Sequence, residues 1–232
     1  MKHRTALLVA AALTFAPFAA HAESAVAIPP PAAEAPAQGA GLETAVLAGG
    51  CFWGIQAVYQ HVKGVTNAVS SYAGGAQKDA VYETVSAGRT GHAEAVKITF
   101  DPREVSYGKI LQIFFSVAHD PTQLNRQGPD TGPQYRSEIF PQNETQQKIA
   151  KDYIAQLDKA RVFRRPIVTK TDTMKTPFFA AEAYHQDYAI HHPNQPYIVI
   201  NDAPKVENLK KMFQDVWRDT PVTVAKAGGV GG

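Results

Sequence analysis

Residues 45–55 have the sequence Ala45-Val46-Leu47-Ala48-Gly49-Gly50-Cys51-Phe52-Trp53-Gly54-Ile55, which contains the only cysteine among the 232 residues. The apolar run before Gly49 predicts a buried strand, and the helical spacing of apolar residues after Gly54 predicts a helix from about Cys51. The Cys51 sulfur is therefore expected at a strand-to-helix turn, where the positive end of the helix dipole can lower its pKa from ~8.5. A thiolate is nucleophilic, so this position suits chemistry. The alternative is a small buried thiol that only packs.

The rest of the chain alternates predicted strands and helices. Strands are predicted over 43–48, 65–72, 94–100, 135–140, 167–171 and 197–200, and helices over 51–62, after Ser106, from Asn143 to about Ala160, near 180–190 and near 203–216. The segments 76–92 and 119–134 are predicted loops. The first six elements run β-α-β-β-α-β, the split order of ferredoxin-like sheets. We therefore expect an α+β fold, a two-layer sandwich with a ferredoxin-like core, in one domain of about 190 residues.

Composition narrows the class of protein. The formal net charge is only +2, and no basic cluster is interleaved with aromatic residues, which argues against a dedicated nucleic-acid binder. The sequence contains neither Gly-x-Gly-x-x-Gly nor Cys-x-x-Cys, so no flavin, nicotinamide or metal cofactor is expected.

Residues 1–22 have the pattern of a signal peptide. A basic start, Lys2-His3-Arg4, precedes an apolar stretch over 6–20 and a small-x-small cleavage pattern at Ala20-His21-Ala22. The alternative, a membrane anchor that is retained, is disfavoured because the stretch is shorter than the ~20 residues of a membrane span. The predicted location is therefore periplasmic or secreted, with no membrane span after cleavage.

The predicted domain organisation follows from composition. Residues 23–41 are rich in proline and alanine, with Pro29-Pro30-Pro31 at their centre, and are expected to form an extended linker that acts as a spacer. The folded domain is expected over 42–220, followed by a glycine-rich tail over 221–232.

Glu94 is a candidate acid. Side chains alternate along a strand, so Glu94 shares the apolar face of 94–100 with Val96 and Ile98. Burial would raise the pKa of its carboxyl and keep it neutral near pH 7, able to donate a proton. Alternatively, Glu94 points to water from the fraying end of the strand.

Four blocks of this sequence resemble the A-type peptide methionine sulfoxide reductases. They are Gly50-Cys51-Phe52-Trp53-Gly54, Gly91-His92-Ala93-Glu94, the loop from His119 to Ser137, and Tyr184-His185-Gln186-Asp187-Tyr188. The resemblance covers roughly residues 43–200. It implies a two-layer α+β fold and reduction of the S epimer of free or protein-bound methionine sulfoxide, an activity that repairs oxidised proteins.

The resemblance also implies residue roles. Cys51 would attack the sulfoxide sulfur and become a sulfenic acid, while Glu94 would protonate the sulfoxide oxygen. Tyr82 and Tyr135 would hold that oxygen by hydrogen bonds, and Asp130 would position this network.

The resemblance gives the aromatic pair Phe52 and Trp53 the role of an apolar pocket for the substrate's methyl group. Without it, aromatic side chains such as these usually pack in a core, and Tyr82 is an ordinary loop tyrosine.

The chain departs from many family members in lacking a second, resolving cysteine, including in the tail Ala225–Gly232. The resemblance then implies an external reductant, such as a thioredoxin-like or glutaredoxin-like protein or a small thiol. An exported enzyme would meet few small thiols, because such compartments are oxidising.

Two other classes stay open at this stage. Cys51 with His185 could serve a cysteine hydrolase or acyl transferase, and the aromatic residues could belong to a peptide-binding module. His191 and His192 near His185 suggest a metal site less well, because their spacing matches no standard zinc pattern.

Overall fold

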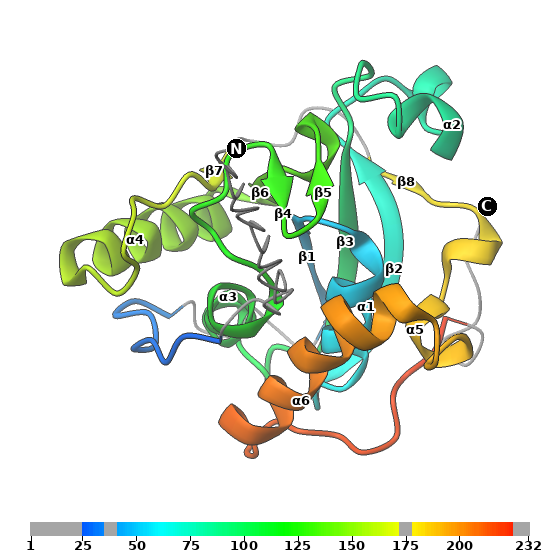
Figure 1. Ribbon diagram of the computed structural model, residues 1–232. Helices are drawn as coiled ribbons and strands as arrows, with labels where there is room; N and C mark the ends of the chain where they lie inside the picture. Colours follow the sequence, from blue (N-terminus) through cyan, green and yellow to red (C-terminus); the bar gives the residue numbers. More distant parts are fainter. Residues whose placement is uncertain (1–24, 35–40, 172–177, 225–232) are drawn as a thin grey trace, which may run out of the picture.

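The protein is described here by a computed structural model that covers residues 25–34, 41–171 and 178–224. Its strands are β1 Glu43–Gly49, β2 Val65–Ala73, β3 Ala93–Phe100, β4 Arg126–Gln127, β5 Asp130–Thr131, β6 Ser137–Phe140, β7 Lys170–Thr171 and β8 Phe179–Ala180. Its α-helices are α1 Phe52–Gln60, α2 Tyr82–Val85, α3 Tyr107–Ile113, α4 Glu144–Ala160, α5 Tyr188–His191 and α6 Ala203–Met212 (Figure 1). Short 3-10 helices cover Gln77–Asp79, Pro133–Tyr135 and Ala183–His185, and π-helices cover Phe114–Ala118 and Ile198–Asp202.

The main sheet has the strand order β7-β6-β1-β3-β2-β8. Its four central strands, β6, β1, β3 and β2, are antiparallel to one another, whereas the edge strand β7 is parallel to β6. Leu47 of β1 pairs with Val96 of β3. The helices α1 and α3 connect these strands in the order β-α-β-β-α-β, so the predicted α+β class and ferredoxin-like core are confirmed.

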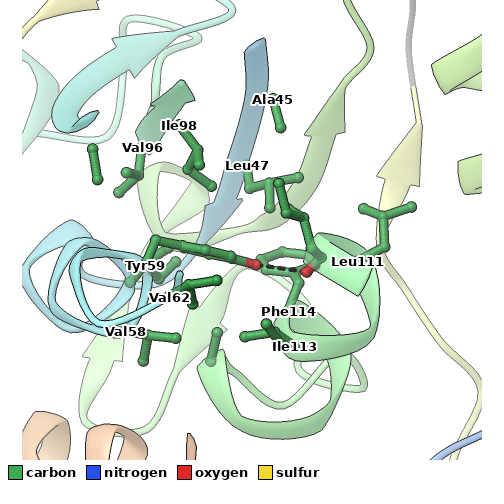
Figure 2. Close-up of a cluster of buried hydrophobic side chains, with 14 of the residues drawn as sticks. Ala45, Leu47, Val58, Tyr59, Val62, Val96, Ile98, Leu111, Ile113 and Phe114 are labelled. Atoms are coloured by element: carbon green, nitrogen blue, oxygen red, sulfur yellow. Dashed lines mark hydrogen bonds between the residues drawn. The ribbon is translucent and has the colours of Figure 1, made fainter. Parts of the chain in front are cut away.

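The core lies between the sheet and its helices. Leu47, Val96 and Ile98 face Tyr59 of α1 and Leu111 of α3, all of them buried (Figure 2). The Tyr59 hydroxyl donates to the Ile110 carbonyl at 2.8 Å. The opposite face of the sheet carries a smaller cluster of mostly small residues: Val46, Ala48, Ala73, Ala93, Ala95 and Phe140.

Helix caps fix two of the helix starts. The Ser106 side chain accepts from the Lys109 N–H at 3.0 Å before α3, and the Asn143 side chain accepts from the Gln146 N–H at 2.8 Å before α4. Both predicted caps are confirmed. The Gln146 side chain, however, accepts from the Gln142 N–H rather than from the cap residue itself.

Residues 25–34, part of the predicted linker, lie extended against α3, α4 and the π-helix Phe114–Ala118 (blue in Figure 1). The expected spacer is therefore a docked arm over these residues, because neighbouring side chains satisfy its backbone groups. The hydrogen bonds are Val26 N–H to Ser116 O at 2.9 Å, Gln112 Nε2 to Ile28 O at 3.0 Å, Tyr153 Oη to Pro29 O at 2.6 Å, Gln156 Nε2 to Pro30 O at 2.9 Å, and Ala32 N–H to Gln156 Oε1 at 2.8 Å.

Other local predictions were wrong. The strand predicted at 197–200 lies in the π-helix Ile198–Asp202, where Val199 is 51% exposed; an apolar run this short fits a strand or a helix equally well. Residues 180–190 form the end of β8, a 3-10 helix and α5, not one helix, and the predicted loop 76–92 contains a 3-10 helix and α2. Tyr135 belongs to a 3-10 helix, and the strand after it begins at Ser137.

The predicted signal peptide over 1–22 lies outside the described residues, as does most of the tail. Across 25–34, 41–171 and 178–224, no helix combines the length and the apolar character needed to cross a bilayer.

Candidate active site

The turn that carries Cys51 requires glycine on both sides. Gly50 has φ +95°, and a Cβ atom there would lie 2.5 Å from the Gln127 side chain. A Cβ atom on Gly54, in the first turn of α1, would lie 2.2 Å from Asp202 Oδ1. Cys51 itself is the N-cap residue of α1. The glycines therefore let two distant segments close around the sulfur.

Cys51 opens onto a cavity of about 180 Å³. The other residues that line it are Phe52, Trp53, Tyr82, Glu94, Asp130, Tyr135, His185 and Tyr197. The structure thus brings together all seven residues that the sequence singled out as site residues. His185 belongs to one of the resembling blocks but was assigned a role only in the hydrolase and metal alternatives, and Tyr197 was missed.

Glu94 lies at the open end of β3 and is 2% exposed. Its Oε2 accepts from the Phe52 N–H at 3.1 Å, in the first turn of α1. Burial raises the pKa of Glu94 to about 8, and the charges of Asp130 and Asp202 add to the rise, while the bonds from Phe52 and Cys51 oppose it. The carboxyl is therefore mostly neutral at pH 7, as its place on the apolar face predicted.

The pKa of the Cys51 thiol differs from the prediction. Burial raises it well above its ordinary value, and the charges of Glu94 and Asp202 raise it further, while a hydrogen bond from the Trp53 N–H lowers it. The expected thiolate is therefore wrong for the substrate-free site, because loss of water and nearby carboxylates outweigh the helix terminus. The resting thiol keeps its proton.

Three tyrosines surround the reacting groups. Burial raises the pKa of Tyr82, Tyr135 and Tyr197, so all three hydroxyls stay protonated and can donate. Tyr197 donates to Asp130 Oδ2. In the structure Asp130 is thus hydrogen-bonded to Tyr197, whereas the resemblance implied that Asp130 positions the hydrogen bonds of Tyr82 and Tyr135.

Aromatic rings form the other side of the cavity. Trp53 stacks on Tyr188 with ring centroids 3.8 Å apart, and its Nε1–H donates to His185 Nδ1 at 3.2 Å. Phe52 is buried against His185, with centroids 5.0 Å apart. Because its neighbours fix each ring, the cavity has a rigid apolar wall beside its polar donors.

His185 is placed as part of that wall. Its Nδ1 accepts from Trp53, and its ring also lies 4.6 Å from that of Tyr82. Burial lowers its pKa, so the imidazole is neutral. A hydrolase would need this ring to accept the Cys51 proton, and the structure directs Nδ1 to Trp53 instead. Among the described residues, no group of three or more His, Cys, Asp and Glu side chains could hold a metal ion.

The cavity combines a single thiol with a neutral carboxylic acid, the nucleophile and the proton donor that a thiol-dependent oxidoreductase needs. Residues 43–217 match the family described as peptide methionine sulfoxide reductase. The chain is 62% identical over 187 residues to peptide methionine sulfoxide reductase MsrA 2 of Mesorhizobium japonicum, covering 81% of this chain and 95% of that protein. Against MsrA of Deinococcus radiodurans it is 47% identical over 180 residues, covering 78% and 86%.

Solved structures agree with this assignment. Methionine sulfoxide reductase A of Corynebacterium diphtheriae matches with a TM-score of 0.57 at 32% identity, covering 68% of this chain and 78% of that one. Reduced Mxr1 of Saccharomyces cerevisiae matches with a TM-score of 0.59 at 30% identity, covering 66% and 87%. The chain belongs to the peptide methionine sulfoxide reductase family.

Proposed function

We propose that this chain reduces the S epimer of methionine sulfoxide, free or in proteins, through a Cys51 sulfenic acid that an external thiol reduces. The observation that carries this proposal is the pairing of Cys51 with neutral Glu94 in one small cavity. A thiol and an acid so placed can attack sulfur and protonate oxygen in one step.

The first half-reaction then balances within the site. The Cys51 sulfur attacks the sulfoxide sulfur, and Glu94 gives its proton to the oxygen. The thiol proton passes to the Glu94 carboxylate as the oxygen transfers, which leaves methionine and Cys51 as a sulfenic acid. Both protons are present at the start because the pKa of each group is raised.

The two walls of the cavity account for the choice of epimer. A sulfoxide carries a polar oxygen and an apolar methyl group on one sulfur. Phe52 and Trp53 suit the methyl group, whereas Tyr82, Tyr135 and Glu94 suit the oxygen. Only one configuration at sulfur places both groups correctly while keeping the sulfur toward Cys51.

The second half-reaction needs a thiol that these 232 residues do not contain, since Cys51 is their only cysteine. A thioredoxin-like or glutaredoxin-like protein, or a small thiol, forms a mixed disulfide with Cys51 and releases water. A second thiol then attacks this mixed disulfide, which restores the Cys51 thiol and releases the two reducing thiols joined as a disulfide.

Residues 1–22 support a periplasmic or secreted location. Their basic start, apolar stretch and cleavage pattern are those of a signal peptide. Chemical sequencing of the mature N-terminus from an exporting bacterial host tests this. A start at Glu23 in the periplasmic or culture fraction is expected, and recovery of the intact chain from the cytoplasm would contradict export.

The activity test uses each epimer of methionine sulfoxide separately, with excess dithiothreitol, and measures the methionine formed. We expect methionine from the S epimer alone, none with Cys51→Ser, and one oxygen atom on Cys51 by mass spectrometry when no reductant is added. A peptide-binding module would bind the sulfoxide without consuming it. A hydrolase would instead trap an acyl group on Cys51.

A further inference from the structure

Cys51 also borders a second, larger cavity. This groove has a volume of about 720 Å³ and lies on the side of residues 122–130 and Arg165, with Asn201 and Lys205 from the C-terminal part. Small-molecule sites commonly have volumes of ~300–1,000 Å³. Tyr197 and Asp130, which are hydrogen-bonded to each other, line both the groove and the sulfoxide cavity. Cys51 thus lies between two cavities.

The two sides differ in charge. The sulfoxide cavity is lined by two carboxyl groups, Glu94 and Asp130, and by no lysine or arginine. The groove is lined by Arg126, Arg165 and Lys205, with Asp130 as its only carboxylate. The cations of the groove would therefore attract a thiolate, whereas the sulfoxide cavity offers it no positive charge.

The cations differ in how they are compensated. Lys205 is 5% exposed, and its ammonium lies 3.3 Å from Asp202 Oδ1. Arg165 reaches Asp120 at 3.7 Å. Arg126 is the exposed residue of β4, and its guanidinium donates to the Gly128 carbonyl. No carboxylate of the described residues forms an ion pair with it. Arg126 is thus the cation best able to bind an incoming carboxylate.

We propose that this groove is the binding site of the reducing thiol, and that it selects an anionic thiol, one that carries carboxylate groups near its sulfur. This inference rests on the proposed function. Arg126 and Arg165 bind the carboxylates, and the buried, paired Lys205 completes the basic lining of the groove. The shared chemistry fits an acidic thiol peptide or a thiol protein with carboxylates around its cysteine.

The step balances as a two-electron reduction. The thiolate sulfur bonds to the Cys51 sulfur of the sulfenic acid, and the hydroxyl group leaves as water by taking a proton from Glu94. A second thiol attacks the mixed disulfide, which restores the Cys51 thiol and releases the oxidised thiol as disulfide.

The test uses the full chain with Arg126→Glu, and with Lys151→Glu, at an exposed position of α4, as a control with the same change in charge. The probes are glutathione, which is anionic, cysteamine, which is cationic, and neutral dithiothreitol, at saturating S-sulfoxide. For Arg126→Glu we expect the ratio of kcat/KM for glutathione to that for dithiothreitol to fall about tenfold, and the cysteamine ratio to rise. Both effects should shrink as salt is added.

Lys151→Glu is expected to change these ratios less than about twofold, since Lys151 does not line the groove and salt screens exposed charges. The proposed groove would be overturned if Arg126→Glu left the ratios unchanged for both glutathione and a reduced thioredoxin-type protein, or if both variants changed the ratios equally. A reduced thioredoxin-type protein serves as a further probe. If it, and not glutathione, loses activity with Arg126→Glu, the ligand is the protein thiol.

A single turnover without any thiol separates this inference from the proposed function. If unaltered chain forms no methionine from the S epimer, the proposed function fails. If it forms methionine but Arg126→Glu does not change the ratios of kcat/KM between thiols, only the groove assignment fails.

Discussion

At the scale of single residues, the protonation of Glu94 governs when the site can work. Its pKa of about 8 means that the acid form predominates below that pH and is lost above it. We therefore expect kcat/KM for the sulfoxide to fall as pH rises through about 8. Stopped-flow measurement of methionine formation in single turnovers reports this step without the reductant.

The control for that pH profile is Glu94→Gln, which keeps an acceptor for the Phe52 N–H but cannot donate an acidic proton. Its rate should be lower by roughly 10²–10⁴-fold and lose the fall near pH 8. A fall that stays at pH 8 in Glu94→Gln would show that another group carries the proton.

The same residue lowers stability. The folded chain holds the Glu94 proton up to about pH 8, whereas the ordinary pKa is 4.5, so the free energy of unfolding falls as pH rises across this range. At about 1.36 kcal/mol per pKa unit the loss is roughly 3–5 kcal/mol. Glu94→Gln should thus gain stability relative to the natural chain between pH 5 and pH 8. Urea unfolding of both chains at pH 5 and at pH 8 measures this difference in the free energy of unfolding. A difference that does not depend on pH would contradict the raised pKa of Glu94.

At the scale of elements, the sequence allowed the centre of the site to be predicted. The change from strand to helix spacing around Cys51 located the β1–α1 turn, and alternation along β3 placed Glu94 on the buried face. Both patterns lie within short stretches of sequence, so they can be read without knowledge of the tertiary fold.

The remaining parts depend on contacts between distant segments. Tyr197 was missed because Tyr197–Ile200 was interpreted as a strand, and Asp202, which faces Gly54, gave no local signal. The raised pKa of Cys51 follows first from burial and then from the charges of Glu94 and Asp202, so its helix-terminal position alone gave the wrong direction.

The docked arm over 25–34 was also not predicted, because its proline- and alanine-rich composition is typical of a free spacer. Its hydrogen bonds lead to a prediction about stability. Gln156 of α4 donates to the Pro30 carbonyl and accepts from the Ala32 N–H. Gln156→Ala removes both bonds and should lower the free energy of unfolding by about 1–3 kcal/mol, given ~0.5–1.5 kcal/mol for each. Thermal unfolding should occur about 2–12 °C lower. Lys151→Ala on the same helix should leave the unfolding temperature unchanged. If both variants unfold at the same temperature, the docked arm does not contribute to stability.

At the scale of the whole molecule, the cysteine count fixes how many electrons the chain can store. Its only cysteine can give two electrons and become a sulfenic acid, and no disulfide can form within these residues to release it. A fully reduced chain, mixed with excess S-sulfoxide and no thiol, should therefore form one methionine per chain and then stop. Quantifying methionine by chromatography against chain concentration gives the ratio.

With added reductant, the methionine formed per molecule of reductant should depend on the number of thiol groups in the reductant. Each further methionine should consume one dithiothreitol, which closes on itself, or two molecules of glutathione, which pair with each other. Cys51→Ser should form none, which excludes reduction by the thiol alone. More than one methionine per chain without reductant would mean that another group supplies electrons, and the single-thiol cycle would have to be abandoned.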